Sequence, residues 1–392
     1  MCSASFLQPI GENACIQECG NATEHIILRP DRETFKILPW MPTHAGVMMG
    51  AYNCDGTPYQ YCPRFQIQDA MQSLKEKYNI EIKIGIEIEF LIMNQQYSPV
   101  EESLYLDSKS LDFYSQQLCE IAKHLKALNT NITGIHKETG RGQFEIILSY
   151  GPVLEILDKY FLAREVINNV LSKHNLIASF IPFVSHDTCS GAHVHLSLWR
   201  DGINICKDIS RQYQMSNECE SFMSGIMEAL PAMVSFLAPS ANSLRRLKDG
   251  SFLGQTMGWS IDFKDVPLRY IPRQQNFELK TMDHTANHYY TLAAILRCGE
   301  LGIEKSMKLS KPIKEQDIQS NQDKEISLAQ VPFNWESIRD QIQNKESGRF
   351  MKEAFRKLSK VIQIHKNIRE HDINYFAKRS FAEEIKITTN RY

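Results

Sequence analysis

Apolar and polar residues alternate along several short segments of the chain, which is the pattern of a half-buried β-strand. The clearest case is residues 81–93, EIKIGIEIEFLIM, where isoleucine fills most of the alternate positions. The same alternation recurs over residues 143–149 (QFEIILS), 192–199 (AHVHLSLW) and 276–280 (NFELK). We therefore expect at least these strands, each with one apolar and one polar face.

A helical spacing begins at about residue 66, where Ile67, Met71, Leu74 and Tyr78 recur every three or four positions. Further helices are expected over residues 110–127, 153–174, 217–237 and 285–305, and over most of residues 333–392. Residues 306–330 are polar and are expected to form a loop.

Residues 25–62 differ from the rest because turn signals interrupt short apolar runs. The signals are Pro30-Asp31, Asp55-Gly56 and Cys62-Pro63. Short strands joined by turns are expected there. The change of pattern near residue 65 predicts two domains, residues 1–65 and residues 66–392.

Composition narrows the class of protein. The 392 residues carry 44 Lys and Arg against 46 Asp and Glu, so the net charge of −2 gives no general attraction to nucleic acid or to an anionic membrane. No secretory leader and no membrane-spanning run is expected. The ten cysteines include no CxxC pair and are expected to stay reduced. These features predict a cytoplasmic protein without nucleic-acid or membrane partners.

Acidic, imidazole and hydroxyl side chains occupy the polar faces of the expected strands. Residues two positions apart share a face, so Glu87 lies beside Glu89 and His193 beside His195. Taken singly, each strand is explained by a face that meets solvent. The full group comprises Glu87, Glu89, Glu145, His193, His195, Ser197 and Glu278.

If these polar faces line one cavity, several carboxylates meet there, and such crowding is costly unless a cation offsets it. Carboxylate oxygens suit Mg²⁺ or Mn²⁺, and a histidine favours Mn²⁺ slightly. Such a constellation is typical of two ions that hold a phosphoryl group. A basic segment with Arg246, Lys264, Arg269 and Lys280 either provides solubility or offsets phosphate charge. The stretch ETGRGQFE (138–145) lacks GK[ST], and no GxGxxG motif occurs.

Seven motifs follow one another in a specific order. They are LRPDRETFKILPW (28–40), DGTPYQYCPR (55–64), GIEIEF (85–90), HKETGRGQFE (136–145), SGAHVHLSL (190–198), NSLRRL (242–247) and ELKTMDHTANHYY (278–290). From about residue 26 onward, the chain thereby resembles the glutamine synthetase superfamily. The resemblance implies an α+β fold. Its catalytic domain would have an antiparallel, barrel-like sheet around the active-site cavity, flanking helices and a shortened β-grasp domain before it.

The resemblance also implies ATP as co-substrate, two or more Mg²⁺ or Mn²⁺ ions, and roles for individual residues. Glu89, Glu138 and Glu145 match the ligands of one ion, and Glu87, His193 and Glu278 match those of another. His136, His195, Ser197 and Arg269 match positions near the nucleotide. Arg246 matches the arginine that holds the amino-acid carboxylate, and Lys264, Arg269 and Lys280 match the cations beside the phosphates.

Several positions depart from the family pattern. Lys264 and Lys280 stand where the family has arginines, and lysine lacks the bidentate fork of arginine. Thr188-Cys189 replaces an Asn-Gly pair, and Phe252 is expected to replace the glutamate that receives ammonium. The segment before Pro30 is short. The sequence therefore does not decide whether this protein forms the double ring and the active site shared between subunits that are usual in the family.

These features predict an ATP-dependent carboxylate–amine ligase. It would transfer the γ-glutamyl group of glutamate, through an acyl phosphate, to an amine other than ammonia. Glutamine synthesis from ammonia is one alternative, and a non-catalytic protein that binds nucleotide and metal is another. The expected partners are small-molecule substrates. A homo-oligomer is also possible from the sequence, which does not indicate how many copies it would contain.

Overall fold

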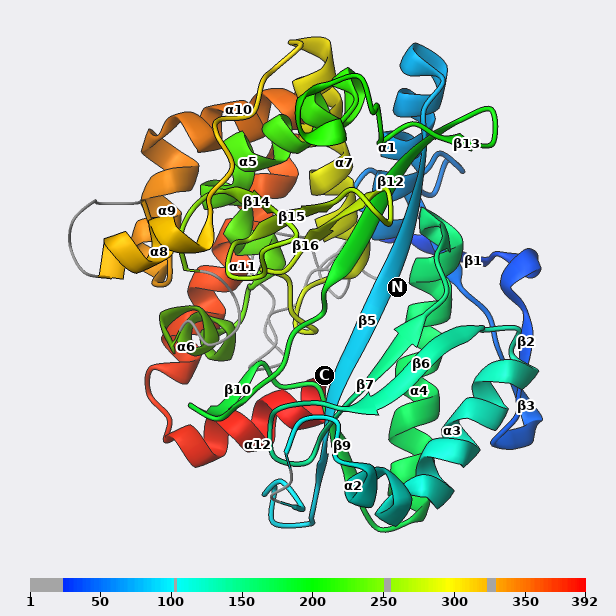
Figure 1. Cartoon of the computed structure of the whole chain (residues 1–392). Coiled ribbons are helices and arrows are strands. Elements are labelled where there is room, and N and C mark those ends of the chain that lie inside the picture. The colour runs from blue at the N-terminus through cyan, green and yellow to red at the C-terminus, as the bar shows by residue number, and fades with distance from the viewer. Residues whose placement is uncertain (1–23, 102–103, 250–254, 323–328) are drawn as a thin grey trace.

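The structure is a computed structural model that describes residues 24–101, 104–249, 255–322 and 329–392. One long strand, β5 (Glu81–Met93), runs through its middle, with helices on both sides (Figure 1). The alternate side chains Ile82, Ile84, Ile86, Ile88 and Phe90 are all buried. The strand and its apolar face are therefore as predicted from the period of two.

β5 is the centre of the main sheet, whose order is β14-β15-β16-β12-β5-β7-β6. β12 pairs with the first half of β5 and β7 with the second half, both antiparallel. β14 and β15 are the one parallel pair along this path among the described residues. The strands are β6 (Ile132–Lys137), β7 (Gln143–Leu148), β12 (Val194–Arg200), β14 (Trp259–Ile261), β15 (Leu268–Ile271) and β16 (Asn276–Leu279), with β8 (Gly151–Pro152), β9 (Ile177–Ser179) and β13 (Ile203–Asn204) paired off the path.

Two buried helices pack against each other beside the sheet. α5 (Asn217–Leu237) begins where Ser216 accepts a hydrogen bond from the Cys219 amide, and α7 (His288–Glu304) begins where Asn287 caps the Tyr290 amide. α1 (Pro63–Tyr78) starts with proline at its first turn and packs on α7. α4 (Val153–Lys173) packs against β5 and, together with α3 (Ser115–Ala127), forms a second helical group.

Most of the remaining elements lie near the two ends of the chain. Near the start, β1 (Ile27–Pro30) pairs with β4 (Met49–Tyr52), and β2 (Lys36–Leu38) pairs with β3 (Met41–Gly46). Near the end are α9 (Trp335–Asn344), α10 (Glu346–Phe355), α11 (Lys360–Phe376) and α12 (Phe381–Arg391). Short 3-10 helices cover Arg32–Thr34, Gln212–Gln214 and Arg356–Leu358, and two small strands, β10 (Phe183–Ser185) and β11 (Thr188–Cys189), pair with each other.

Two expectations differ from the structure. The helix expected over 110–127 is divided into α2 (Ser108–Phe113) and α3, because Tyr114 leaves the helical conformation between them. The loop expected over 306–330 contains the helix α8 (Glu315–Gln322). Its first turn carries Glu315 and Asp317, which favour a helix N-terminus. Its polar sequence offers no apolar periodicity, which is why the pattern indicated a loop.

Two further expectations concern the whole described chain. Within that part, no helix combines the length and the apolar composition that a membrane crossing requires. Its cysteines, Cys54, Cys62, Cys119, Cys189, Cys206, Cys219 and Cys298, form no disulfide.

A half-buried histidine joins α11 to α5. The Nε2 atom of His365 lies 2.6 Å from the Ser235 carbonyl oxygen. Its ring stacks on Phe236 at 4.0 Å between centroids. Burial lowers the pKa of His365 to about 3, since a charged imidazole would lose its hydration there.

We therefore expect the fold to lose stability in mild acid. Between pH 6.5, the ordinary pKa of histidine, and pH 3, the unfolded chain binds a proton at His365 that the folded chain does not. The free energy of unfolding then falls as pH falls, by about 1.4 kcal/mol per pH unit for one such group. His365→Gln should reduce this slope in urea titrations between pH 6 and pH 4, whereas His44→Gln, at an exposed site, should not. An unchanged slope in His365→Gln would contradict the assignment.

Candidate active site

The register of the sheet brings the acidic and imidazole side chains together. Glu89 on β5 lies directly opposite Glu145 on β7, and Glu145 lies opposite His136 on β6. On the other side of β5, Glu278 on β16 lies opposite His195 on β12. Directly opposed side chains are about 5 Å apart at Cβ. The polar faces of five neighbouring strands therefore meet on one side of the sheet.

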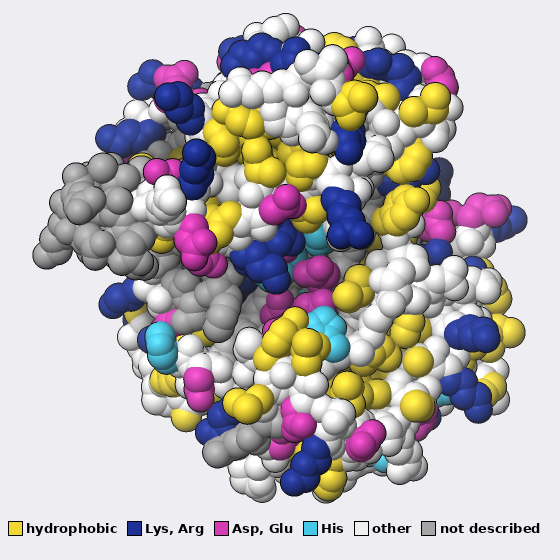
Figure 2. Space-filling model, in the orientation of Figure 1, with side chains coloured by type: hydrophobic (Ala, Val, Ile, Leu, Met, Phe, Trp, Pro, Cys, Tyr) yellow, Lys and Arg dark blue, Asp and Glu magenta, His cyan; other side chains and the backbone are white. Residues whose placement is uncertain are grey.

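These faces line a cavity of about 520 Å³. Figure 2 shows acidic and imidazole side chains in a hollow near the middle of the molecule, with Lys and Arg side chains along its upper rim. The sequence-predicted residues that line it are Glu87, Glu89, His136, Glu138, Glu145, His193, Arg246, Lys264, Arg269, Glu278 and Lys280. The structure therefore assembles most of the predicted site in one place.

The first cluster of metal-type donors is Glu87, His193 and Glu278, which offer ligand atoms within 4.8 Å of one another. His193 Nδ1 lies 3.1 Å from Glu87 Oε2 and 3.4 Å from Glu278 Oε1. Burial raises the pKa of the Glu87 carboxyl, but hydrogen bonds from His193 and His195 outweigh burial and hold that pKa below its ordinary value. This is the same trio that the sequence indicated for one ion.

The second cluster is His136, Glu138 and Glu145. His136 Nε2 lies 2.9 Å from Glu138 Oε1 and 3.9 Å from Glu145 Oε1. The trio indicated by sequence had Glu89 in the place of His136. In the structure, Glu89 Oε2 accepts hydrogen bonds from Gln143 Nε2 and the Gly191 amide, both at 2.7 Å. Its other oxygen faces His193 Nδ1 at 3.6 Å, so Glu89 lies between the two clusters.

The donor set fits a hard divalent cation. Burial and the neighbouring carboxylates of Glu87, Glu89, Glu138 and Glu278 raise the pKa of Glu145 to about 10. A carboxyl group in such a place resists ionisation unless positive charge is added. Carboxylate oxygens with one imidazole per cluster are the donors that Mg²⁺ and Mn²⁺ accept.

Basic side chains also line this cavity. Arg246 is buried and donates to the Thr281 and Met282 carbonyls at 3.3 Å. Lys280 Nζ donates to the Lys264 carbonyl at 3.0 Å. Arg269 Nη2 forms an ion pair with Glu278 Oε2 at 2.6 Å. Positive groups therefore line the same cavity as the carboxylates, an arrangement suited to binding anionic oxygens there.

Two predicted residues, His195 and Ser197, are not among the residues that line the cavity. His195 Nε2 contacts Glu87 Oε1 at 3.1 Å, and Ser197 Oγ accepts a hydrogen bond from Trp199 Nε1 at 2.9 Å. The predicted role of Phe252 falls outside the described residues.

Other lining residues were not singled out from the sequence. Tyr105 places its ring 6.1 Å from that of His136, and Gln143 holds Glu89. Tyr105 lies between two leucines and gave no signal, whereas Gln143 belongs to the motif around Glu145. Cys189, which replaces the family's glycine, also lines the cavity, and burial raises the pKa of its thiol to about 12. A neutral thiol of this kind is a poor nucleophile.

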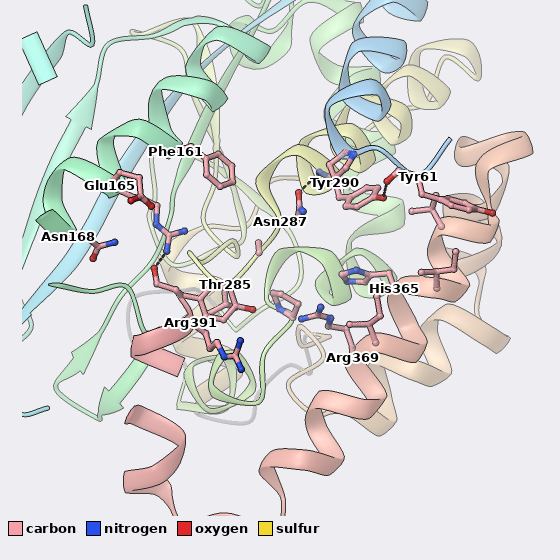
Figure 3. Close-up of a pocket in the computed structure, with 18 residues that line it drawn as sticks. Tyr61, Phe161, Glu165, Asn168, Thr285, Asn287, Tyr290, His365, Arg369 and Arg391 are labelled. Carbon is pink, nitrogen blue, oxygen red and sulfur yellow. Dashed lines mark hydrogen bonds between the residues drawn. The ribbon is translucent and has the colours of Figure 1, made fainter. Parts of the chain in front are cut away.

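A second cavity of about 400 Å³ lies between α4, the start of α7, α11 and the end of α12 (Figure 3). Residues 281–290 run between the two cavities. The Thr281 carbonyl accepts from Arg246 on the first side, while Thr285 and Tyr290 line the second. Among the described residues, the two cavities share no lining side chain, so the predicted chemistry belongs to the first alone.

The crowding of carboxylates predicts a measurable effect on stability. Without divalent metal, Glu145→Gln should raise the melting temperature, because the folded wild type must keep this group protonated above its ordinary pKa. The wild type loses stability as pH rises from 4.5 toward 10, so the gain should be larger at pH 8 than at pH 6. Mg²⁺ or Mn²⁺ should then stabilise the wild type more than the variant.

The matched control is Glu155→Gln, an exposed residue of α4 that pairs only with Lys159 among the described residues. It should change the melting temperature little. A Glu145→Gln variant that melts below the wild type in EDTA would refute the crowding argument.

The chain is similar to known proteins over most of its length. The family model described as the glutamine synthetase catalytic domain matches residues 60–388. A type-1 glutamine synthetase of Dictyostelium discoideum is 28% identical over 367 residues, 86% of this chain and 71% of that protein. A gamma-glutamylpolyamine synthetase of Streptomyces coelicolor is 28% identical over 309 residues, 75% of this chain and 66% of that protein.

Solved structures support the fold. A ligand-free structure of GmaS superposes with a TM-score of 0.82 at 22% identity, covering 93% of this chain and 85% of that one. A glutamine synthase homologue superposes with a TM-score of 0.84 at 19% identity, covering 100% and 90%. Members of the matched family use ATP and divalent metal ions. The chain belongs to the glutamine synthetase catalytic-domain family and is an ATP-dependent ligase that forms carbon–nitrogen bonds.

Proposed function

We propose that this ligase joins the γ-carboxyl group of glutamate to an organic amine other than ammonia, through a γ-glutamyl phosphate. The observation that carries the proposal is the pair of donor clusters, Glu87–His193–Glu278 and His136–Glu138–Glu145, in a cavity that basic side chains also line. Such an arrangement suits the transfer of a phosphoryl group between two anions.

In this proposal each cluster holds one divalent ion, with Glu89 placed to contribute to either. The ions supply positive charge that neutralises the phosphate oxygens and the substrate carboxylate. His195 Nε2 lies 3.1 Å from Glu87 Oε1, and Gln143 Nε2 donates a hydrogen bond to Glu89 Oε2 at 2.7 Å. These supporting bonds keep the carboxylates in position before any substrate arrives.

The basic side chains of the cavity would hold the reacting anions. Arg246 is assigned to the α-carboxylate of glutamate, while Lys264, Arg269 and Lys280 offset charge on the phosphoryl group. A γ-carboxylate oxygen of glutamate attacks the γ-phosphorus of ATP, and ADP leaves. The amine, after losing a proton, attacks the acyl carbon and phosphate leaves, and loss of a second proton gives the neutral amide. No protein nucleophile is needed, because the substrate carboxylate performs the attack.

An organic acceptor is favoured over ammonia by two observations. The family resemblance places Phe252 near the position where the family pattern has the carboxylate for ammonium. The relative from Streptomyces coelicolor is named for a polyamine product, and an amine of that kind is a cation that an acidic cavity attracts.

The test is phosphate release from Mg-ATP and from Mn-ATP with glutamate, across ammonium, methylamine, ethanolamine, putrescine and spermidine. The expected result is release that requires glutamate and one organic amine, with a product whose mass is that of glutamate plus amine minus water. Faster product formation from ammonium at equal concentration would establish glutamine synthesis instead. Nucleotide binding with no release from any acceptor would overturn the ligase reaction proposed here.

The metal assignment gives a second expectation. Glu278→Gln should lower amine-dependent phosphate release about 100-fold or more, because it removes a charged donor from the first cluster. Glu346→Gln, whose side chain is 71% exposed on α10, serves as the matched control and should retain wild-type release. Full activity in Glu278→Gln would exclude a catalytic role for that cluster.

A further inference from the structure

Lys137 is a buried lysine that the proposed reaction does not use. It is the last residue of β6, adjacent to Glu138, and none of its surface is exposed. Its ammonium donates to the carbonyl oxygens of Glu138 and Gly140, both at 2.6 Å, and lies 3.6 Å from Glu101 Oε1. Two hydrogen bonds and one ion pair thus surround the ammonium, which accounts for a charged group in a fully buried place.

Two of these acceptors belong to the turn that carries Glu138. Lys137 draws the carbonyls of Glu138 and Gly140 inward, while the Glu138 carboxylate faces the cavity. The turn closes through the Gly140 amide, which donates to Gln143 Oε1 at 2.8 Å. At Gly142 the backbone has φ +62°, and a Cβ would lie 2.7 Å from the Ile92 carbonyl. The turn is therefore tight, and Lys137 is a charged side chain bonded to two of its carbonyls.

Lys137 also fixes the segment on the other side of the second cluster. Its carbonyl oxygen accepts a hydrogen bond from the Leu106 amide at 3.1 Å. The ion pair with Glu101 holds the same segment five residues earlier. Tyr105, between these two contacts, reaches the cavity beside His136. One residue thus joins two segments that both contribute side chains to the cavity.

We infer that Lys137 is a positioning residue for the second metal cluster, His136–Glu138–Glu145, and does not itself touch metal or substrate. The inference rests on the proposed use of divalent metal. Without the ammonium, two buried carbonyls and the Glu101 carboxylate lose their partner, and the turn must move to find water. The Glu138 carboxylate then loses its fixed position beside His136, and only the second cluster is affected.

The experiment measures Mn²⁺ binding by electron paramagnetic resonance in Lys137→Met, which keeps the length of the side chain but removes its donors. We expect one of the two ions to bind 10- to 100-fold more weakly, the usual cost of losing support behind a ligand, and the ion at Glu87–His193–Glu278 to bind as in the wild type. Lys159→Met, which removes an exposed partner of Glu155 on α4, is the matched control and should bind both ions normally.

A second readout needs no metal. Hydrogen exchange of the Thr139 and Gly140 amides should be at least about tenfold faster in metal-free Lys137→Met than in the wild type, because the turn opens more often. Lys137→Gln keeps two amide donors and should lose less Mn²⁺ affinity than Lys137→Met, which covers the case in which the methionine variant does not fold.

The double variant Lys137→Met/Glu101→Gln separates two explanations. If Lys137 acted only by neutralising Glu101, the double variant would regain Mn²⁺ affinity, and that result would overturn the inference. Unchanged affinity for both ions in Lys137→Met would also overturn it. A wild type that binds no Mn²⁺ would instead refute the proposed function, so the two failures are distinguishable.

Discussion

Mutual repulsion among buried carboxylates is the constraint on which the site depends. Glutamates from neighbouring strands and one turn face a single cavity, and each needs a partner for its charge. Glu87 and Glu138 each contact a histidine, and Glu278 forms an ion pair with an arginine. Glu89 accepts hydrogen bonds from the Gln143 side-chain amide and the Gly191 backbone amide. Glu145 has no hydrogen-bond donor among the described residues. Burial and repulsion from the neighbouring carboxylates therefore raise its pKa. A divalent ion would relieve that repulsion, which links binding to stability.

A rigid sheet makes such crowding tolerable. β5 contributes Glu87 and Glu89 to the cavity, while Ile86 and Ile88 point into the core between its helices. A slip of one residue in its register would bury the acids in the apolar core and expose the isoleucines. The cost of that exchange fixes the register, and the register in turn fixes the distances between carboxylates. Core packing and site geometry are therefore consequences of the same alternation.

Some of the site was predictable residue by residue, and some was not. The polar faces of the strands followed from the period of two, and the family resemblance grouped Glu87, His193 and Glu278, whose ligand atoms lie within 4.8 Å of one another in the structure. The hydrogen bonds that Glu89 accepts from Gln143 and the Gly191 amide could not be read from any spacing in the sequence. Support from Lys137 was equally hidden, because a lysine at the end of a strand is ordinarily exposed.

The sequence by itself determined four strands of the main sheet, most of the helices, the residue types of the site and, through seven ordered motifs, the family. These are local or ordered features, and a period or a motif is written in neighbouring residues. Only the tertiary structure decided which strands are adjacent and hence which side chains meet. It also decided which carboxylate is paired, because pairing depends on contacts between residues far apart in the chain. The helix α8 is also a feature that only the structure revealed, because its polar sequence has no apolar periodicity from which a helix could be predicted.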